Sequence, residues 1–201
     1  SRTQSALLEA MEEGNVTVDG YTYALPKPFT VIATQNPAGA SGTSLLPDSQ
    51  IDRFMLRISM GYPSASEEKA MLEARKNGTN PLESVNQACD IDTLLKMQEE
   101  VKEVFIHDKI IDYIIHLVNK TRGNESLLRG ASPRATLALT SMSKAAAYIE
   151  ERNYVTPQDV QKVFVPTIAH RLILTPEAEV GDQRPEFICK DILKNAIVPK
   201  I

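Results

Sequence analysis

The hydrophobic pattern changes its period near residue 62, where short strand-like runs give way to helical repeats. Before that point, the β-forming residues 16–18 and 21–23 flank an Asp-Gly pair, which predicts a two-stranded hairpin. Residues 29–34 are almost continuously apolar or β-branched, as in a strand covered on both faces of a parallel sheet. Residues 56–60 alternate as in a half-buried strand. The pattern therefore predicts part of an α/β layer.

After residue 62 the apolar residues recur at steps of three and four. The clearest helix starts at Ser132-Pro133, where a serine cap and a first-turn proline precede an apolar face. Thr156-Pro157 repeats this pattern, and Pro166 is expected to kink or end the helix that follows. We therefore expect an all-helical part over residues 63–201. Other segments with helical spacing are 64–77, 91–101, 110–118 and 188–197.

Composition is that of a folded protein and narrows the range of partners. The chain has 201 residues, 42% of them hydrophobic and 24% charged, which is enough to bury a core. The net charge is −4 with no basic cluster, so a nucleic-acid partner is not expected. Two cysteines and the absence of any apolar run of about 18 residues lead us to expect a cytoplasmic protein without a membrane segment.

Several catalytic signatures are missing from the sequence. There is no Gly-x-x-x-x-Gly-Lys-Ser/Thr phosphate loop, and no apolar strand ends in Asp-Glu. The three histidines lack metal-ligand spacing, so no metal site is predicted. The Gly39–42 region fails the Gly-x-Ser-x-Gly pattern of hydrolases because position 43 is threonine. A self-contained active site is therefore not expected.

Five separated motifs resemble the MoxR family of AAA+ ATPases in order and spacing. They are TQSALLEAMEE at 3–13, VTVDG at 16–20, IATQNP at 32–37, QIDRF at 50–54 and GASPRA at 130–135. The similarity extends to the end of the chain. It implies an α/β remnant of a P-loop AAA+ nucleotide-binding domain over residues 1–62, followed by an all-α helical lid domain over residues 63–201. The Walker A and Walker B segments would precede residue 1.

The resemblance gives roles to three polar residues. Asn36 matches sensor 1, whose amide orients the attacking water, although it could simply begin a turn before Pro37. Arg53 resembles the arginine finger that enters a neighbouring subunit's nucleotide site, and a surface pair with Asp52 is the alternative. Arg134 resembles the nucleotide-binding sensor 2. An arginine at a helix N-terminus opposes the helix dipole, which favours a functional reason for it.

Two further segments have a role by resemblance or by position. The hairpin over residues 16–23 resembles an insertion that precedes sensor 1 and faces the ring pore or the substrate, and an ordinary edge hairpin is the alternative. His170-Arg171 lies near the end of the predicted helix that starts at Thr156-Pro157. We expect this pair to contact the last carbonyls of that helix.

The implied function belongs to a longer protein. It would bind ATP and Mg²⁺, assemble with neighbouring subunits into a homo-oligomeric, hexameric ring, and remodel or assist assembly of protein clients, including metalloenzymes. A von Willebrand-type protein is the further partner that the resemblance implies. The 201 residues alone are expected to be inactive because the phosphate loop is missing. The alternatives are a non-enzymatic helical interaction module and a motor closer to magnesium chelatase or replicative helicases.

Overall fold

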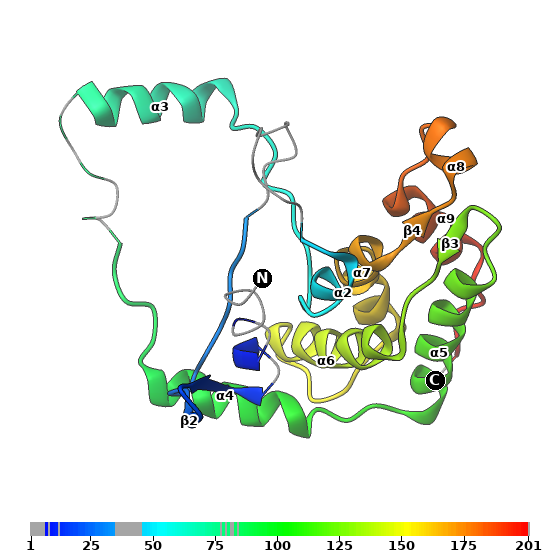
Figure 1. Ribbon diagram of the computed structural model, residues 1–201, viewed down its shortest axis with the longest axis horizontal. Helices are drawn as coiled ribbons and strands as arrows, with labels where there is room; N and C mark the ends of the chain where they lie inside the picture. Colours follow the sequence, from blue (N-terminus) through cyan, green and yellow to red (C-terminus); the bar gives the residue numbers. More distant parts are fainter. Residues whose placement is uncertain are drawn as a thin grey trace.

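The computed structural model describes residues 7, 9–11, 13–34, 46–76, 78, 80, 83 and 85–200. Figure 1 shows short strands and isolated helices in the first half of the chain and a packed group of helices in the second half. The elements in chain order are β1 (Asn15–Val18), β2 (Tyr21–Ala24), α2 (Asp48–Ile51), α3 (Ala65–Lys76), α4 (Ile91–Glu103), α5 (Asp108–Arg122), β3 (Leu127–Arg129), α6 (Pro133–Ile149), α7 (Pro157–Ile168), the 3₁₀ turn η2 (Ala169–Arg171), β4 (Ile173–Leu174), α8 (Pro176–Val180) and α9 (Pro185–Asn195).

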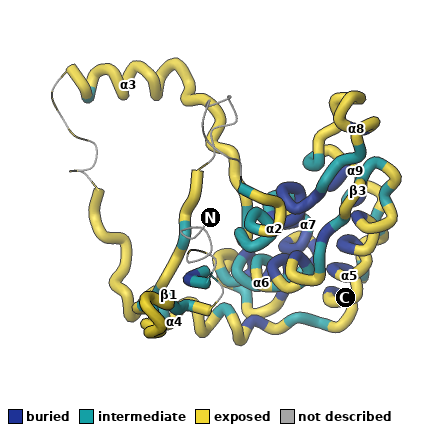
Figure 2. Tube along the Cα trace, viewed as in Figure 1, coloured by how far each residue is buried: buried dark blue, intermediate teal, exposed yellow. Residues whose placement is uncertain are grey.

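The hydrophobic core lies among α5, α6, α7 and α9. Figure 2 shows the buried positions gathered on these helices, whereas α3 and the segments around it are exposed. Phe164 of α7, Leu139 of α6 and Leu117 of α5 are completely buried in one cluster. Truncating such a side chain to alanine costs about 2–5 kcal/mol, so this cluster is the main source of stability in the helical part.

The predicted helix starts are confirmed by the local hydrogen bonds. The Ser132 hydroxyl accepts the Ala135 amide, and Pro133 occupies the first turn of α6. Thr156 and Asp159 form a reciprocal capping box at the start of α7. These caps satisfy amides that have no partner inside the helix, which is why their sequence signals are reliable.

α7 loses its regular hydrogen bonding near its C-terminal end. Pro166 lies inside the helix, which continues to Ile168 and then tightens into the turn η2. Proline has no amide hydrogen, so one bond of the helix is missing at this point. The Pro166 carbonyl, one of those left free at a helix end, accepts the amide of Arg57 at 2.8 Å. The end of α7 is therefore an attachment point for the first part of the chain.

The Asp-Gly hairpin is confirmed. β1 and β2 pair antiparallel, with Val18 opposite Tyr21. The two turn residues, Asp19 and Gly20, both have positive φ, at 51° and 83°. This is the turn geometry that matches the twist of a two-residue hairpin.

The other two predicted strands are not formed. Residues 29–34 and 56–60 carry no regular structure, and Ile32 and Met60 are 88% and 95% exposed. A strand needs a neighbouring backbone to complete its hydrogen bonds. Among the described residues, the paired strands are β1 with β2 and β3 with β4, so neither stretch has a partner. The apolar pattern of these two stretches predicted buried strands, but the described residues do not cover them.

Candidate functional site

The Asp52 carboxylate joins the segment after α2 to the helical core. α2 ends at Ile51, and Asp52 follows as its C-cap residue. Asp52 Oδ1 lies 3.2 Å from Arg171 Nη1, and the Ser132 hydroxyl lies 3.0 and 3.2 Å from the two carboxylate oxygens. Ser132 is the N-cap of α6, and Arg171 is the last residue of η2. One carboxylate thus bonds to the ends of two core elements.

Arg171 and His170 also bind the main chain that follows Asp52. Arg171 Nη2 donates to the Phe54 carbonyl at 2.6 Å and lies 3.4 Å from the Met55 carbonyl. His170 Nε2 lies 3.1 Å from the same Phe54 oxygen. A carbonyl only accepts, so the neutral ring carries its proton on Nε2. The expectation that this pair serves its own helix is therefore incomplete, because both side chains reach a segment more than 110 residues earlier in the chain.

Arg57 fastens the far end of this segment. Its amide donates to the Pro166 carbonyl of α7, as described above. Its guanidinium forms an ion pair with Glu186 of α9. We refer to residues 52–57, held at both ends by the helical core, as the docked segment.

Burial sets the charge state of the two side chains from η2. Arg171 is 5% exposed and His170 is 8% exposed. Burial lowers the pKa of His170 to about 4, with the nearby positive charges of Arg171 and Arg57 acting in the same direction, so the ring is neutral at pH 7. Burial also lowers the pKa of Arg171, and the Asp52 carboxylate opposes this effect. An arginine remains protonated under these conditions.

Of the two arginines singled out by the sequence, one contacts the Asp52 carboxylate and the other is its neighbour in the chain. Arg53 is partly buried and directly follows Asp52 in the chain. Arg134 lies in the first turn of α6 with 48% of its side chain exposed, and its Nη1 is 4.0 Å from Asp52 Oδ2. At that distance and exposure the attraction is weak. Asp52 therefore holds Arg171 firmly and Arg134 loosely.

Positive charge is in excess at this place. We call the group the Asp52 junction; its members are Asp52, Arg53, Ser132, Arg134 and Arg171. Burial is the main cause that lowers the pKa of Arg171, and the positive charge of Arg134 acts in the same direction. The group holds three arginines and one carboxylate, and arginine is a side chain that binds anions such as phosphate with paired hydrogen bonds.

Asn36, the third residue predicted from the sequence, lies outside the described residues. Within the part of the chain that is described, no three His, Cys, Asp or Glu residues gather where they could hold a metal ion. The described residues therefore offer no cluster of Mg²⁺ ligands. No helix among them is long and apolar enough to cross a membrane.

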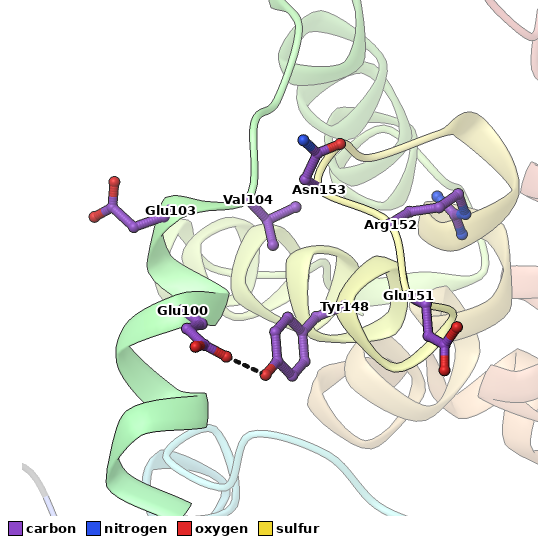
Figure 3. Close-up of a pocket in the computed structure, with 7 residues that line it drawn as sticks. All are labelled: Glu100, Glu103, Val104, Tyr148, Glu151, Arg152 and Asn153. Atoms are coloured by element: carbon purple, nitrogen blue, oxygen red, sulfur yellow. Dashed lines mark hydrogen bonds between the residues drawn. The ribbon is translucent and has the colours of Figure 1, made fainter. Parts of the chain in front are cut away.

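A separate pocket of about 520 Å³ opens between the ends of α4 and α6 (Figure 3). The Tyr148 hydroxyl donates to Glu100 across it, and this bond raises the pKa of Tyr148. Glu103 and Glu151 add further negative charge to its wall. None of the residues of the Asp52 junction lines this pocket.

Two family models match the chain, and the residues of the Asp52 junction are divided between the two matched regions. Residues 1–56 match the ATPase family associated with various cellular activities, and residues 119–192 match the AAA lid domain. Arg53 lies in the first region and Arg134 in the second. The Asp52 junction is therefore where the two matched regions meet. Together they define an AAA+ ATPase core region joined to its helical lid.

Individual relatives indicate which family of AAA+ ATPases the chain resembles. The chain is 42% identical to the uncharacterized protein YeaC of Bacillus subtilis over 98% of its own length and 62% of that protein. It is 36% identical to the chaperone MoxR1 of Mycobacterium tuberculosis over its whole length and 55% of that protein. A solved structure of a candidate ATPase from Cytophaga hutchinsonii matches the whole chain and 63% of that protein, with 36% identity and a TM-score of 0.90.

The chain belongs to the MoxR family of AAA+ ATPases. This confirms the resemblance drawn from the five motifs. It also confirms the fold class, an AAA+ core remnant followed by a helical lid. The chain spans about three fifths of the length of the relatives it matches.

Proposed function

We propose that this chain carries the ATP-responsive arginines of a MoxR-family ATPase. In this proposal Arg134 acts as sensor 2 on nucleotide bound to its own subunit, and Arg53 acts as the arginine finger in the neighbouring subunit's site. Asn36 acts as sensor 1. The observation that carries the proposal is the Asp52 junction, where the carboxylate preceding Arg53 in the chain contacts Arg134 and Arg171 of the lid region.

The exposure and weak pairing of Arg134 support its role. Its side chain is half exposed and 4.0 Å from Asp52, so it can leave this carboxylate for a phosphate oxygen at small cost. A charge-assisted bond to phosphate is worth more than that weak pair. Arg171 cannot make the same exchange, because it is buried and bonded to the docked segment. We infer that Arg134 is the arginine of the junction that responds to nucleotide.

The remaining parts of the proposal come from the family. ATP with Mg²⁺ supplies the phosphoryl group that is transferred to water, and we place its main binding motifs, Walker A and Walker B, before residue 1. We place the boundary between core and lid near residue 62. One relative is named a chaperone. By that likeness we infer a cytoplasmic homo-oligomeric ring, hexameric in our proposal, that uses lid movement to remodel or assemble protein clients, with a von Willebrand-type protein as a partner.

The matched regions also bear on the alternatives. A helical interaction module would need only the lid, yet the core region matches as well and is bonded to the lid through Asp52. The named MoxR relatives favour this family over a magnesium chelatase or helicase-like motor.

Mixing subunits of the full-length protein tests the assignment of Arg53. Arg53→Ala subunits keep their own nucleotide site but lack the finger, whereas subunits with a disabled Walker B segment lack hydrolysis but keep the finger. Mixed rings should regain part of the ATP turnover that either variant alone has lost, because some intact sites then face intact fingers. Arg75→Ala, on the exposed end of α3, is the control and should turn over ATP normally without mixing. Mixtures as inactive as both parents would contradict the proposal.

A further inference from the structure

The main chain around Arg53 is held by the lid. On one side of it, Asp52 bonds to Ser132 and Arg171. On the other side, the Phe54 carbonyl accepts from Arg171 and His170. Arg171 therefore contacts the docked segment both before and after Arg53, and its side chain is buried.

The shape of the guanidinium explains how one residue does this. Arg171 Nη1 faces Asp52 Oδ1 at 3.2 Å, while Nη2 donates to the Phe54 carbonyl at 2.6 Å. The two nitrogens belong to one rigid planar group, so the carboxylate and the carbonyl are held at a fixed separation. A lysine carries a single ammonium group on a flexible stem and cannot fix both partners in this way.

We propose that Arg171 is a positioning residue for Arg53, and that the lid of each subunit thereby carries the arginine finger directed at its neighbour. The proposal rests on the assignment of Arg53 as the finger. A charged group that stabilises a transferring phosphoryl must be placed to within about 1 Å, and such a displacement can cost on the order of 10² in rate. The buried fork of Arg171 supplies this placement by fixing the chain on both sides of the finger.

The same geometry links the two arginines of the proposed function. Arg134 and Arg171 share the Asp52 carboxylate, and the positive charge of Arg134 lowers the pKa of Arg171. When Arg134 turns to phosphate in its own subunit, Asp52 keeps its bonds to Arg171 and Ser132. The docked segment then follows the lid. Nucleotide binding in one subunit thus changes the position of the finger offered to the next.

The test compares Arg171→Lys with Arg152→Lys in the full-length protein. Arg152 is a matched control, because it also pairs with a lid carboxylate, Asp159, through two nitrogens but makes no contact with the docked segment. Arg171→Lys should leave ATP affinity within about twofold and lower turnover on the order of 10²-fold. Mixing with Walker B-disabled subunits should restore part of the turnover. Arg152→Lys should keep normal turnover without mixing.

Hydrogen exchange provides a readout that does not depend on activity. The Arg57 amide is bonded to the Pro166 carbonyl and should be protected in the wild type and in Arg152→Lys. In Arg171→Lys it should exchange at least about tenfold faster, because the docked segment opens locally. If Arg171→Lys folds poorly, His170→Phe takes its place, because it removes one donor to the Phe54 carbonyl while keeping a ring in the site. We expect the loss of turnover and the faster exchange of the Arg57 amide to have the same direction and a smaller magnitude.

The outcomes separate this proposal from the one on which it rests. Rescue of Arg53→Ala by mixing, together with no rescue of Arg171→Lys or unchanged exchange at Arg57, would overturn the positioning role and leave the finger assignment standing. Failure to rescue Arg53→Ala would overturn both, because there would be no finger for Arg171 to position. Rescue of both variants with faster exchange at Arg57 is the result we expect.

Discussion

The Arg171 guanidinium and the Asp52 carboxylate lie 3.2 Å apart, although 119 residues separate them in the chain. The contact joins a region that matches the AAA ATPase core to a region that matches the AAA lid. Because Arg171 is buried, its charge depends on this carboxylate and on the carbonyls of the docked segment. Asp52 is therefore the counterion of the buried Arg171, beside the main-chain hydrogen bonds and the Arg57–Glu186 pair that also hold the docked segment.

Removing that carboxylate should destabilise the chain. In Asp52→Ala, the Arg171 charge stays buried without its counterion, which typically costs about 3–5 kcal/mol. We expect a loss near the lower end of this range, because Asp52 is itself partly exposed and water can enter. Urea unfolding of the 201-residue chain measures the change. A loss below about 0.5 kcal/mol, the size of an ordinary surface substitution, would show that Asp52 is not the counterion of Arg171.

Arg134→Ala should behave in the opposite way. Its side chain is half exposed and 4.0 Å from Asp52, so its loss should change the free energy of unfolding by no more than about 0.5 kcal/mol. In the full-length protein the same change should weaken ATP binding or slow hydrolysis, because a charge-assisted bond to phosphate is worth roughly 1.5–3 kcal/mol. Thermal melts and nucleotide titrations check the two halves. A mutant with a much lower melting temperature and normal ATP handling would mean that Arg134 is a structural residue of the lid.

The buried histidine predicts a specific pH dependence. Burial lowers the pKa of His170 to about 4, whereas the unfolded chain takes up this proton near pH 6.5. The folded-state pKa is depressed, so the stability contributed is fully present above about pH 6.5 and is lost as the pH falls towards 4. The difference corresponds to roughly 3 kcal/mol over that window.

His170→Gln should remove this dependence. Glutamine can donate to the Phe54 carbonyl in place of the ring nitrogen, but it does not titrate. Unfolding free energies measured at several values between about pH 7.5 and 4.5 should fall less steeply for the variant than for the wild type. Parallel curves for the two proteins would mean that the His170 ring is protonated equally well in the folded and unfolded chains.

The helices were predictable because their signals are local. Ser132 and Thr156 start α6 and α7 through bonds to amides three residues away, and such short-range chemistry can be read directly from the sequence. The strands expected over residues 29–34 and 56–60 depended on partners that periodicity does not reveal. β3 and β4 were missed for a related reason, since two or three residues carry no pattern of their own.

In the site, too, local sequence signals were predictable and contacts between distant residues were not. The family resemblance singled out Arg53 and Arg134, and the structure places Arg134 4.0 Å from the carboxylate of Asp52, the residue before Arg53. The role of Arg171 was not predicted, because nothing local distinguishes a buried arginine that reaches 117 residues back from one that serves its own helix. The sequence showed His170-Arg171 and Asp52-Arg53-Phe54 only as two separate motifs. Tertiary contact was needed to connect them.

The most direct test of the account is the single-turnover hydrolysis rate of full-length Arg53→Ala with ATP already bound. A finger that stabilises charge only as the phosphoryl group transfers matters little to binding and much to the rate. We predict a rate lowered by about 10³-fold, the range typical of arginine fingers, with ATP affinity within about twofold of the wild type. A rate that stays near that of the wild type, or an affinity that falls as much as the rate does, would contradict the assignment of Arg53.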